Sequence, residues 1–498
     1  MDRYCTRRFV LGGLGAVIAA GAAQAGPPQV SLRPQMRGAN FVRRQAGGID
    51  ALIAKSGLSG QVVCAVADVK TGLELEAAGG TTGLPPASVA KALTALYALE
   101  TLGADHRFTT RLMAVGPVQN GILKGDLILA GGGDPTLNTD DLAAMAADLK
   151  KTGIREVHGD FLVYEAALPV VRSIDPEQPD HVGYSPAVSG LALNFNRVHF
   201  EWRLAGKRYA VTMDARTGRY RPDVAMARMK VVRRNLPVYT YADQQGSDQW
   251  TVASKALGKG GARWLPVRKP GAYAGDVFAT MARSHGIVLK PARIAVRLPG
   301  EARTLVQHHS TPLRPILKDM LKYSNNLTAE MVGLSTTVAR GKRPASLADS
   351  AAEMSRWAAG RFGMTGTRLV DHSGLGAASR MTAQDLVGAL VQARKQDVLG
   401  PLLKPFGLRD AKGRVNRSHP ISVNAKTGTL NFVSGLGGYM VAEDGTELAF
   451  AIFAADTRAR SQLRRADRER PQGARGWNRR AKRLQQQMIE RWGMLYGN

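Results

Sequence analysis

The pattern of apolar positions near the start of the chain predicts a strand pair followed by a helix. Residues 61–79, "QVVCAVADVKTGLELEAAG", read as two strands joined by a turn at Lys70-Thr71-Gly72. The stretch "ASVAKALTALYAL", residues 87–99, is apolar and helix-forming, so we expect a buried helix there. Lys91 lies within this helix. A lysine in a protein core is rare unless it is paired or functional, which makes Lys91 the first candidate for chemistry.

The middle and the end of the chain differ in their patterns of apolar and polar residues. From about residue 108 to 299, short strand-like segments alternate with Gly- and Pro-rich turns such as "GGGDP". Helical periodicity returns over 311–334 and 380–394, and three strand-like segments follow over 421–456. The chain has 498 residues, which exceeds the size at which a single core stops growing. Strands and helices at both ends, with a different block between them, predict one domain that is interrupted by an insertion.

This organisation divides the chain into four parts. We expect a signal peptide over residues 1–25 and the first part of the main domain over 26–107. Inserted β-rich domains are expected over 108–303, and the second part of the main domain over 304–498. No internal repeat is present in the sequence.

The last part of the chain predicts an amphipathic closing helix after an Arg-rich linker, Arg458–Arg480. The apolar residues of this helix follow one another at spacings of four, four and three, which places them on one helix face. They are Leu484, Met488, Trp492 and Leu495. We expect this face to pack on the sheet that the predicted strands form.

The N-terminus has the features of an export signal. "MDRYCTRRFVLGGLGAVIAAGAAQAGPP" combines a positive start, a short apolar stretch and the small-residue tripeptide Ala23-Gln24-Ala25, so we expect cleavage after Ala25. Arg7-Arg8 resembles the pair of a twin-arginine signal. The apolar stretch is short for a membrane span, and no later stretch is long enough. The sequence therefore predicts an exported, periplasmic protein.

The net charge of the chain restricts the kinds of partner that it is expected to bind. The formal net charge is +28 and the pI is about 10.5, which favours polyanions. An export signal argues against nucleic acid, so peripheral contact with anionic polymers of the cell envelope is the interpretation that remains. The alternative is an Arg-rich composition without a specific partner, and the sequence leaves both open. The nine histidines show no spacing typical of metal ligands.

Ser88 and Lys91 are candidate catalytic residues because of their spacing. Residues three apart lie on one face of a helix, so the hydroxyl and the amine lie side by side. A serine needs a base to become a nucleophile, and a lysine can serve when burial lowers the pKa of its amine. An arbitrary Ser-x-x-Lys is more often a helix cap beside a solvated lysine, but this chain contains only one copy.

Two further motifs follow in the chain. Ser324-Asn325-Asn326 lies at the start or at an interruption of a helical stretch. Lys-Thr-Gly occurs three times, at Lys70, Lys151 and Lys426. The first copy is at a predicted hairpin tip and the second at a predicted helix end, so both are interpreted as turns. Only the copy at Lys426 lies in a strand-like run, where backbone, hydroxyl and ammonium can line one edge of a cleft.

Ser-x-x-Lys, Ser-x-Asn and Lys-Thr-Gly in this order are the signature of penicillin-binding proteins and serine β-lactamases. Within that group, the chain resembles the D-alanyl-D-alanine carboxypeptidases and endopeptidases of peptidase family S13. The resemblance covers "GDLILAGGGDPTL", "SGLALNFNRVHFEW", "STPLRPILKDMLKYSNNLTAE", "DHSGLG" and "AKTGTLNFVSGLGGYM". The long gap between the first two motifs is typical of this family, which carries extra domains there.

The resemblance implies an α+β fold. The main, catalytic domain would pair an antiparallel sheet with a helical cluster, and inserted β-rich domains would interrupt it. The implied reaction is cleavage of D-Ala-D-Ala termini, of D-Ala-containing cross-links of peptidoglycan, or of both, through an acyl-enzyme. Penicillins and other β-lactam antibiotics would acylate the same serine. Peptidoglycan stem peptides are the implied substrates, and no metal or organic cofactor is required.

The resemblance also implies a role for each motif residue. Ser88 would be the nucleophile and Lys91 its general base. Ser324 would relay the proton to the leaving D-alanine, and Asn326 would orient Lys91 and the substrate. On the last motif, Lys426 would supply positive charge and Thr427 would bind the terminal carboxylate. Gly428 belongs to the substrate-binding strand, and the backbone N–H groups of Ser88 and Thr429 would form the oxyanion hole.

Two other functions stay open at this stage. A β-lactamase or a related penicillin-recognising esterase would share the acylation step and differ in fast deacylation. A catalytically idle protein that binds the cell wall through its basic surface belongs to a different class. Penicillin labelling separates the idle protein from the two enzymes, and the rate of label loss separates the enzymes from each other.

Overall fold

The structure is a computed structural model that describes residues 47–244 and 246–497, and from Gly48 onward they belong to one compact unit. The expected signal peptide, residues 1–25, lies outside the described residues. Among the helices of the described ranges, none has the length and apolar character that crossing a membrane requires.

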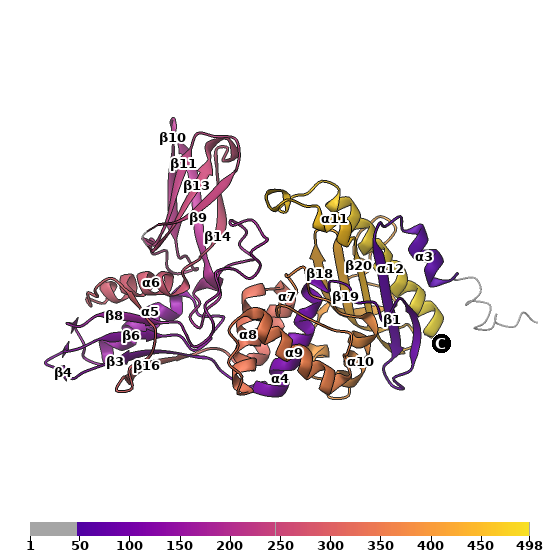
Figure 1. Ribbon diagram of the computed structural model, residues 1–498, viewed down its shortest axis with the longest axis horizontal. Coiled ribbons are helices and arrows are strands. Elements are labelled where there is room, and N and C mark those ends of the chain that lie inside the picture. Colours follow the sequence, from indigo (N-terminus) through magenta and orange to yellow (C-terminus); the bar gives the residue numbers. More distant parts are fainter. Residues whose placement is uncertain (1–46, 245, 498) are drawn as a thin grey trace, which may run out of the picture. The chain divides into compact units, whose positions relative to one another are not determined.

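The main domain contains a six-stranded antiparallel sheet with helices on both faces (Figure 1). The strand pair predicted over 61–79 lies next to the strands from the far end of the chain, because β1 pairs with β20. Alternate residues of β1 face opposite sides, so that Val63 and Ala65 contact one core and Cys64 and Val66 another. In sheet order the strands are β17 (Lys404–Pro405), β18 (Ser422–Leu430), β19 (Val433–Val441), β20 (Glu447–Ala455), β1 (Gln61–Asp68) and β2 (Glu74–Ala78).

The closing helix α12 (Ala474–Tyr496) packs on one face of this sheet with α3 (Ile49–Lys55). The predicted stripe is buried: Leu484, Met488 and Trp492 are at most 1 % exposed. The helix begins at Ala474, before the end of the Arg-rich linker predicted over 458–480, because buried Trp477 and Ala481 extend its apolar face and pack on Ala454. A short helix, α11 (Thr457–Ser461), also lies inside the predicted linker.

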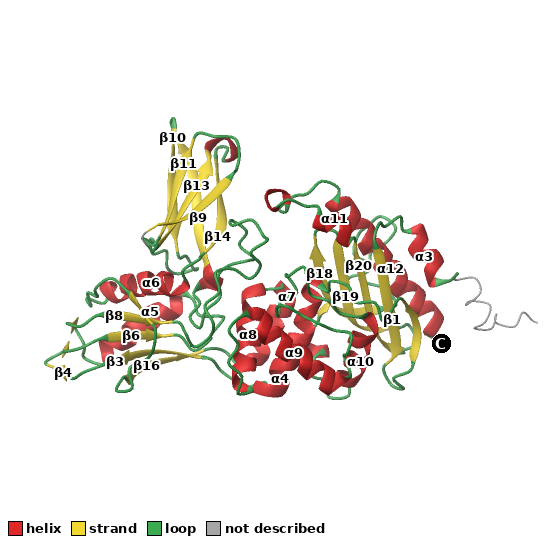
Figure 2. Cartoon of the chain, in the orientation of Figure 1, coloured by secondary structure: helices red, strands yellow, loops and turns green. Residues whose placement is uncertain are grey.

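The opposite face of the sheet is covered by α10 and by a cluster of helices around α4, which Figure 2 shows beside the sheet. This face shares one hydrophobic core with the helices, in which Val89, Leu93 and Phe453 are fully buried. The helices are α4 (Ala90–Leu102), α7 (Leu313–Tyr323), α8 (Asn326–Ala339), α9 (Leu347–Phe362) and α10 (Ala383–Arg394).

The block between α4 and α7 contains a mixed five-stranded sheet in the order β15-β8-β6-β3-β16, with α5 (Thr139–Lys151) and α6 (Pro270–Ser284) in its core. The predicted domain boundary at 303/304 is too early, because one more strand belongs to this block. β16 runs from Arg303 to His309 and pairs with β3, so the block ends after His309. The other strands are β3 (Thr109–Ala114), β6 (Leu127–Ala130), β8 (Phe161–Tyr164) and β15 (Arg293–Ala295).

Three small sheets complete this block, which we call the inserted block, residues 108–309. One is β10-β9-β14, the second is β11-β13-β12, and the third is β4-β5-β7. Their bounds are β4 (Val118–Gln119), β5 (Ile122–Leu123), β7 (Glu156–Val157), β9 (Arg197–Ala205), β10 (Arg208–Asp214), β11 (Ala227–Val232), β12 (Tyr239–Gln244), β13 (Ser247–Ala253) and β14 (Gly260–Pro266).

Candidate active site

Ser88 lies in a single 3-10 turn, Ala87–Val89, that leads directly into α4. The turn is held from two sides by close backbone approaches. A Cβ atom at Gly374 would lie 1.9 Å from the carbonyl oxygen of Ala87, and one at Gly428 would lie 2.9 Å from the nitrogen of Ser88. Only glycine fits at these two positions, so strand β18 passes directly beside the serine.

Lys91 is fully buried and lies at the centre of the site. Its Nζ atom is 2.9 Å from Ser88 Oγ, 2.7 Å from Asn326 Oδ1 and 2.8 Å from the carbonyl oxygen of Ser373. The last two atoms are acceptors, so they take the two N–H groups of a neutral amine. The remaining lone pair of that amine then faces the hydroxyl of Ser88, as a general base requires.

Burial lowers the pKa of Lys91 from its ordinary value to about 8. Two buried carboxyl groups, Glu330 and Asp371, oppose this effect by favouring the charged amine. Burial also raises the pKa of both carboxyl groups. The environment therefore brings the amine of Lys91 within reach of neutral pH, where a base is most effective.

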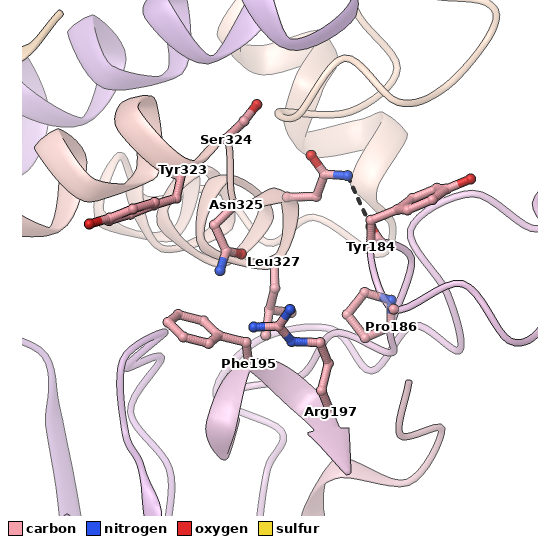
Figure 3. A pocket seen from close by; sticks show the side chains of 10 residues that line it. Tyr184, Pro186, Phe195, Arg197, Tyr323, Ser324, Asn325 and Leu327 are labelled. Carbon is pink, nitrogen blue, oxygen red and sulfur yellow. Dashed lines mark hydrogen bonds between the residues drawn. The ribbon is translucent and has the colours of Figure 1, made fainter. Parts of the chain in front are cut away.

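Asn326 is held in one orientation by a residue of the inserted block. Its Nδ2 donates a hydrogen bond of 2.9 Å to the carbonyl oxygen of Tyr184 (Figure 3). Because the amide nitrogen is used there, Oδ1 faces Lys91. The inserted block thus contacts Asn326 through a backbone carbonyl, which local sequence patterns do not reveal.

Glu330 is a functional candidate that sequence reasoning missed. Its carboxylate accepts the backbone N–H groups of His372 at 3.0 Å and Ser373 at 2.9 Å, and it is fully buried. These bonds fix the loop whose Ser373 carbonyl contacts Lys91. Glu330 lies four residues after Asn326 on α8, and this spacing, which places both on one helix face, is the signal that could have indicated it.

Ser324 and Lys426 form the second half of the site. Ser324 ends α7 in the left-handed region, with φ of +58°, and its hydroxyl lies 2.9 Å from Lys426 Nζ. Lys426 also donates to the carbonyl oxygen of Thr427 and is 1 % exposed. Burial, followed by the positive charge of Lys91, lowers the pKa of Lys426 to about 6. When Lys91 is neutral, it no longer lowers the pKa of Lys426 by repulsion. The two amines therefore do not both hold a proton easily.

The structure separates the three Lys-Thr-Gly copies. Lys426 is on β18, where Thr427 is half-buried, Gly428 adjoins Ser88, and Thr429 is exposed. Lys70 is exposed in the turn between β1 and β2. Lys151 is exposed at the end of α5 and pairs with Asp148. Only the copy at Lys426 lies beside the other motif residues.

A cavity of about 200 Å³ adjoins Ser324 and Asn326 (Figure 3). One wall comes from the α7–α8 junction and the other from the inserted block, where Phe195 and Arg197 are turned toward it. The cavity is lined by Gly183, Tyr184, Pro186, Phe195, Arg197, Tyr323, Ser324, Asn325, Asn326 and Leu327. In the described ranges, no group of three or more His, Cys, Asp or Glu residues is arranged to hold a metal ion.

Comparisons with known proteins agree on one family. The sequence profile of the D-Ala-D-Ala carboxypeptidase 3 (S13) family matches residues 45–470. The D-alanyl-D-alanine carboxypeptidase of Actinomadura sp. (strain R39) is 31 % identical over 447 residues, which cover 81 % of this chain and 79 % of that protein. The D-alanyl-D-alanine carboxypeptidase DacB of Haemophilus influenzae is 28 % identical over 400 residues, 75 % and 81 % of the two chains.

A solved structure has the same fold. Penicillin binding protein 4 (dacB) from Haemophilus influenzae matches with a TM-score of 0.69 at 22 % identity, over 82 % of this chain and 93 % of that one. The fold class that we predicted, a penicillin-binding-protein-like catalytic domain with inserted β-rich domains, is confirmed.

Proposed function

Because the chain belongs to the D-Ala-D-Ala carboxypeptidase 3 (S13) family, as its sequence motifs indicated, we propose that it cleaves D-Ala-D-Ala peptides through an acyl-enzyme on Ser88. The chain is a serine-type hydrolase with D-Ala-D-Ala carboxypeptidase relatives. The proposal goes beyond this class by assigning the covalent intermediate and the role of each side chain.

In the first proposed step, neutral Lys91 takes the proton of Ser88 while Ser88 Oγ attacks the carbonyl carbon between the two D-alanines. The backbone N–H groups of Ser88 and Thr429 would stabilise the oxyanion, which is supported by the passage of β18 beside the serine. The peptide bond then breaks, and the leaving D-alanine takes a proton through Ser324. Water releases the acyl group from Ser88 in the second step.

Lys426 and Thr427 are proposed to bind the terminal carboxylate of the substrate. Lys426 Nζ lies 2.9 Å from Ser324 Oγ, and no acidic side chain of the described residues pairs with it. A bound carboxylate would favour the charged form of Lys426 and oppose the lowering of its pKa by burial. Substrate binding would therefore charge Lys426 and, through repulsion, keep Lys91 neutral for the attack.

The observation that carries the proposal is the set of three contacts of Lys91 Nζ, which direct its lone pair at Ser88. The test is labelling of the purified protein with fluorescent penicillin. A stable covalent label supports the peptidase, and rapid loss of the label would favour the β-lactamase alternative. Absence of any label would favour the idle wall-binding protein.

The pH dependence of acylation is a direct prediction of this arrangement. Lys91 must be neutral to act, and its pKa is lowered to about 8. We expect the first-order rate of acylation at saturating penicillin, where the bound carboxylate keeps Lys426 charged, to rise about tenfold per pH unit between pH 6 and 7.5, and to level off above about pH 8. Stopped-flow measurement of labelling checks this, with protein stability followed by fluorescence at each pH. A flat profile over this range would contradict the assignment of Lys91 as the base.

The cellular setting and the range of substrates are also part of the proposal. A signal peptide over 1–25 would export the enzyme to the periplasm, where peptidoglycan stem peptides and cross-links are its substrates. Release of D-alanine from a pentapeptide would demonstrate carboxypeptidase activity. Cleavage of a purified cross-linked dimer would demonstrate endopeptidase activity. We further propose that residues 108–309 form the inserted domains of one interrupted catalytic domain.

Contact with anionic envelope polymers is proposed for one face of α12. Arg464 and Arg465, within the basic run, are engaged in ion pairs with Asp467 and Asp180. Among the described residues, the basic side chains on the first turns of the helix are exposed and form no ion pair: Arg475, Arg479, Arg480, Lys482 and Arg483. Exposed charges of this kind act over about 10 Å at 0.1 M salt.

We expect binding of the protein to isolated cell-wall sacculi to weaken steeply between 0.05 M and 0.5 M salt. Replacing Arg475, Arg479, Arg480 and Arg483 with Gln is expected to remove most of this salt dependence, while turnover of a small D-Ala-D-Ala peptide stays near normal. A sedimentation assay with sacculi measures the effect. Binding that the four substitutions leave unchanged would show that this face has no such role.

A further inference from the structure

The segment between α11 and α12, residues 462–473, contacts the inserted block through ion pairs. We call it the arm. Arg465 Nη2 lies 2.9 Å from Asp180 Oδ1, and Arg468 Nη2 lies 3.2 Å from Glu177 Oε2. Glu469 contacts His181 at 2.6 Å and Arg263 at 2.9 Å. The facing loop, residues 175–185, has the sequence "DPEQPDHVGYS", so an acidic loop faces a basic arm.

The arm also forms hydrogen bonds to two other segments, the facing loop and the turn after β18. Arg465 Nε donates to the carbonyl oxygens of Pro176 and Gln178. On the other side, Asn431, in the turn after β18, donates from Nδ2 to the carbonyl oxygen of Arg468 at 2.6 Å. The arm thus joins the strand that carries Lys426 to the loop of the inserted block.

The ends of this loop are tied together by hydrogen bonds. The Ser185 hydroxyl bonds to both the N–H and the carbonyl of Asp175. The Tyr184 hydroxyl donates to Gln178 Oε1 at 3.0 Å, and Gln178 Nε2 donates to Asp175 at 2.7 Å. These bonds connect Gln178 directly to Tyr184, so we expect a displacement of one to displace the other.

Tyr184 is the residue whose carbonyl oxygen accepts the hydrogen bond of Asn326. Asn326 Oδ1 in turn accepts a hydrogen bond from Lys91. A continuous set of contacts consequently runs from the arm, through the loop and Asn326, to the proposed base. The contact between Tyr184 and Asn326 is a single hydrogen bond, so it depends on the loop being held in position.

We propose that Arg465 and Glu469 are positioning residues for the reaction at Ser88, because their ion pairs with the inserted block hold the Tyr184 carbonyl against Asn326. This inference rests on the proposed function of Ser88 and Lys91. It assigns a role in the reaction to a segment that lies outside all three sequence motifs. The substrate is unchanged; the ion pairs set the fraction of enzyme in which Asn326 faces Lys91.

A charge-reversal cycle on Arg465 and Asp180 tests the proposal. Each single variant, Arg465→Asp and Asp180→Arg, places like charges in contact and is expected to lower the penicillin acylation rate about fivefold. The double variant restores an opposite-charge pair but not the hydrogen bonds from Arg465 Nε to Pro176 and Gln178, so it is expected to acylate faster than either single variant. Arg464→Asp is the matched control, since Arg464 is exposed and, within the described part of the chain, pairs only with Asp467 of the arm itself.

A pH profile separates positioning from a general loss of structure. When Asn326 is released, Lys91 loses an acceptor that stabilises its charged form, so the pKa of Lys91 falls. The rising limb of acylation is then expected to shift to lower pH in both single variants and to return in the double variant. The wild type is expected to lose acylation rate between 0.05 M and 1 M salt, whereas Arg465→Asp loses little.

Single variants that acylate like the wild type would overturn this inference, as would a double variant that acylates no faster than they do. An equal loss in Arg464→Asp would also overturn it, because the effect would then be one of net charge. A wild-type protein that takes no penicillin label would overturn the proposed function, and the inference with it. Labelling that is normal in every variant would overturn the positioning role alone.

Discussion

Replacing Ser88 with alanine is expected to abolish covalent penicillin labelling. The substitution removes the only atom to which the acyl group would be attached, so the residual signal should equal that of a denatured control. The side chain of Ser88 lies in a turn held by the backbone of Gly374 and Gly428, so the fold should remain. Gel fluorescence and intact-protein mass measure the label, and thermal unfolding measures the fold.

A neighbouring serine provides the matched comparison. Ser324→Ala keeps the nucleophile and removes the proposed proton relay, so we expect slower labelling that still reaches one label per protein at long times. If Ser88→Ala retained the label, or if the mass shift mapped to a peptide without Ser88, the assignment of the nucleophile would be wrong.

Replacing Lys91 is expected to lower the acylation rate by about 10²–10⁴-fold, the usual contribution of general base catalysis. Lys91→Met is the better variant, because it fills most of the space of a fully buried side chain, whereas alanine leaves a cavity beside α8. Lys426→Ala is also expected to slow acylation, since the carboxylate of penicillin loses its cationic partner. Stopped-flow labelling at saturating penicillin measures the loss in Lys91→Met, and labelling at subsaturating penicillin measures the loss in Lys426→Ala.

The other Lys-Thr-Gly copies serve as controls for this prediction. Lys70→Ala and Lys151→Ala remove exposed charges at a turn and at a helix end, so both should acylate at nearly the wild-type rate. A loss in either variant as large as that in Lys426→Ala would show that the wrong copy was assigned to the site.

The motif residues were predictable because their chemistry depends on local spacing. Ser88 and Lys91 are three residues apart, and residues three apart on a helical turn lie on one face whatever surrounds them. The apolar stripe of the closing helix follows the same logic, and the structure buries it against the sheet. Strand context separated Lys426 from the two turn copies, because hairpin tips and helix ends have recognisable residues.

Other features could not be read from the chain. The predicted boundary at 303 falls at the start of β16, whose pairing partner β3 is almost 200 residues earlier. Tyr184 acts through a backbone carbonyl, which every residue possesses, so its side chain gives no signal. The spacing of four residues from Asn326 could have indicated Glu330. Its partners, however, are backbone N–H groups of a distant loop.

The sequence by itself determined the family, the order of the motifs, and the type of most helices and strands in the main domain. These depend on periodicity and on short-range geometry, which each segment carries within itself. The tertiary structure alone decided how Asn326 is oriented, which carbonyl completes the contacts of Lys91, and where the Arg-rich arm binds. Those contacts join segments up to about 290 residues apart, and they exist only after packing has desolvated the groups and brought them within hydrogen-bonding distance.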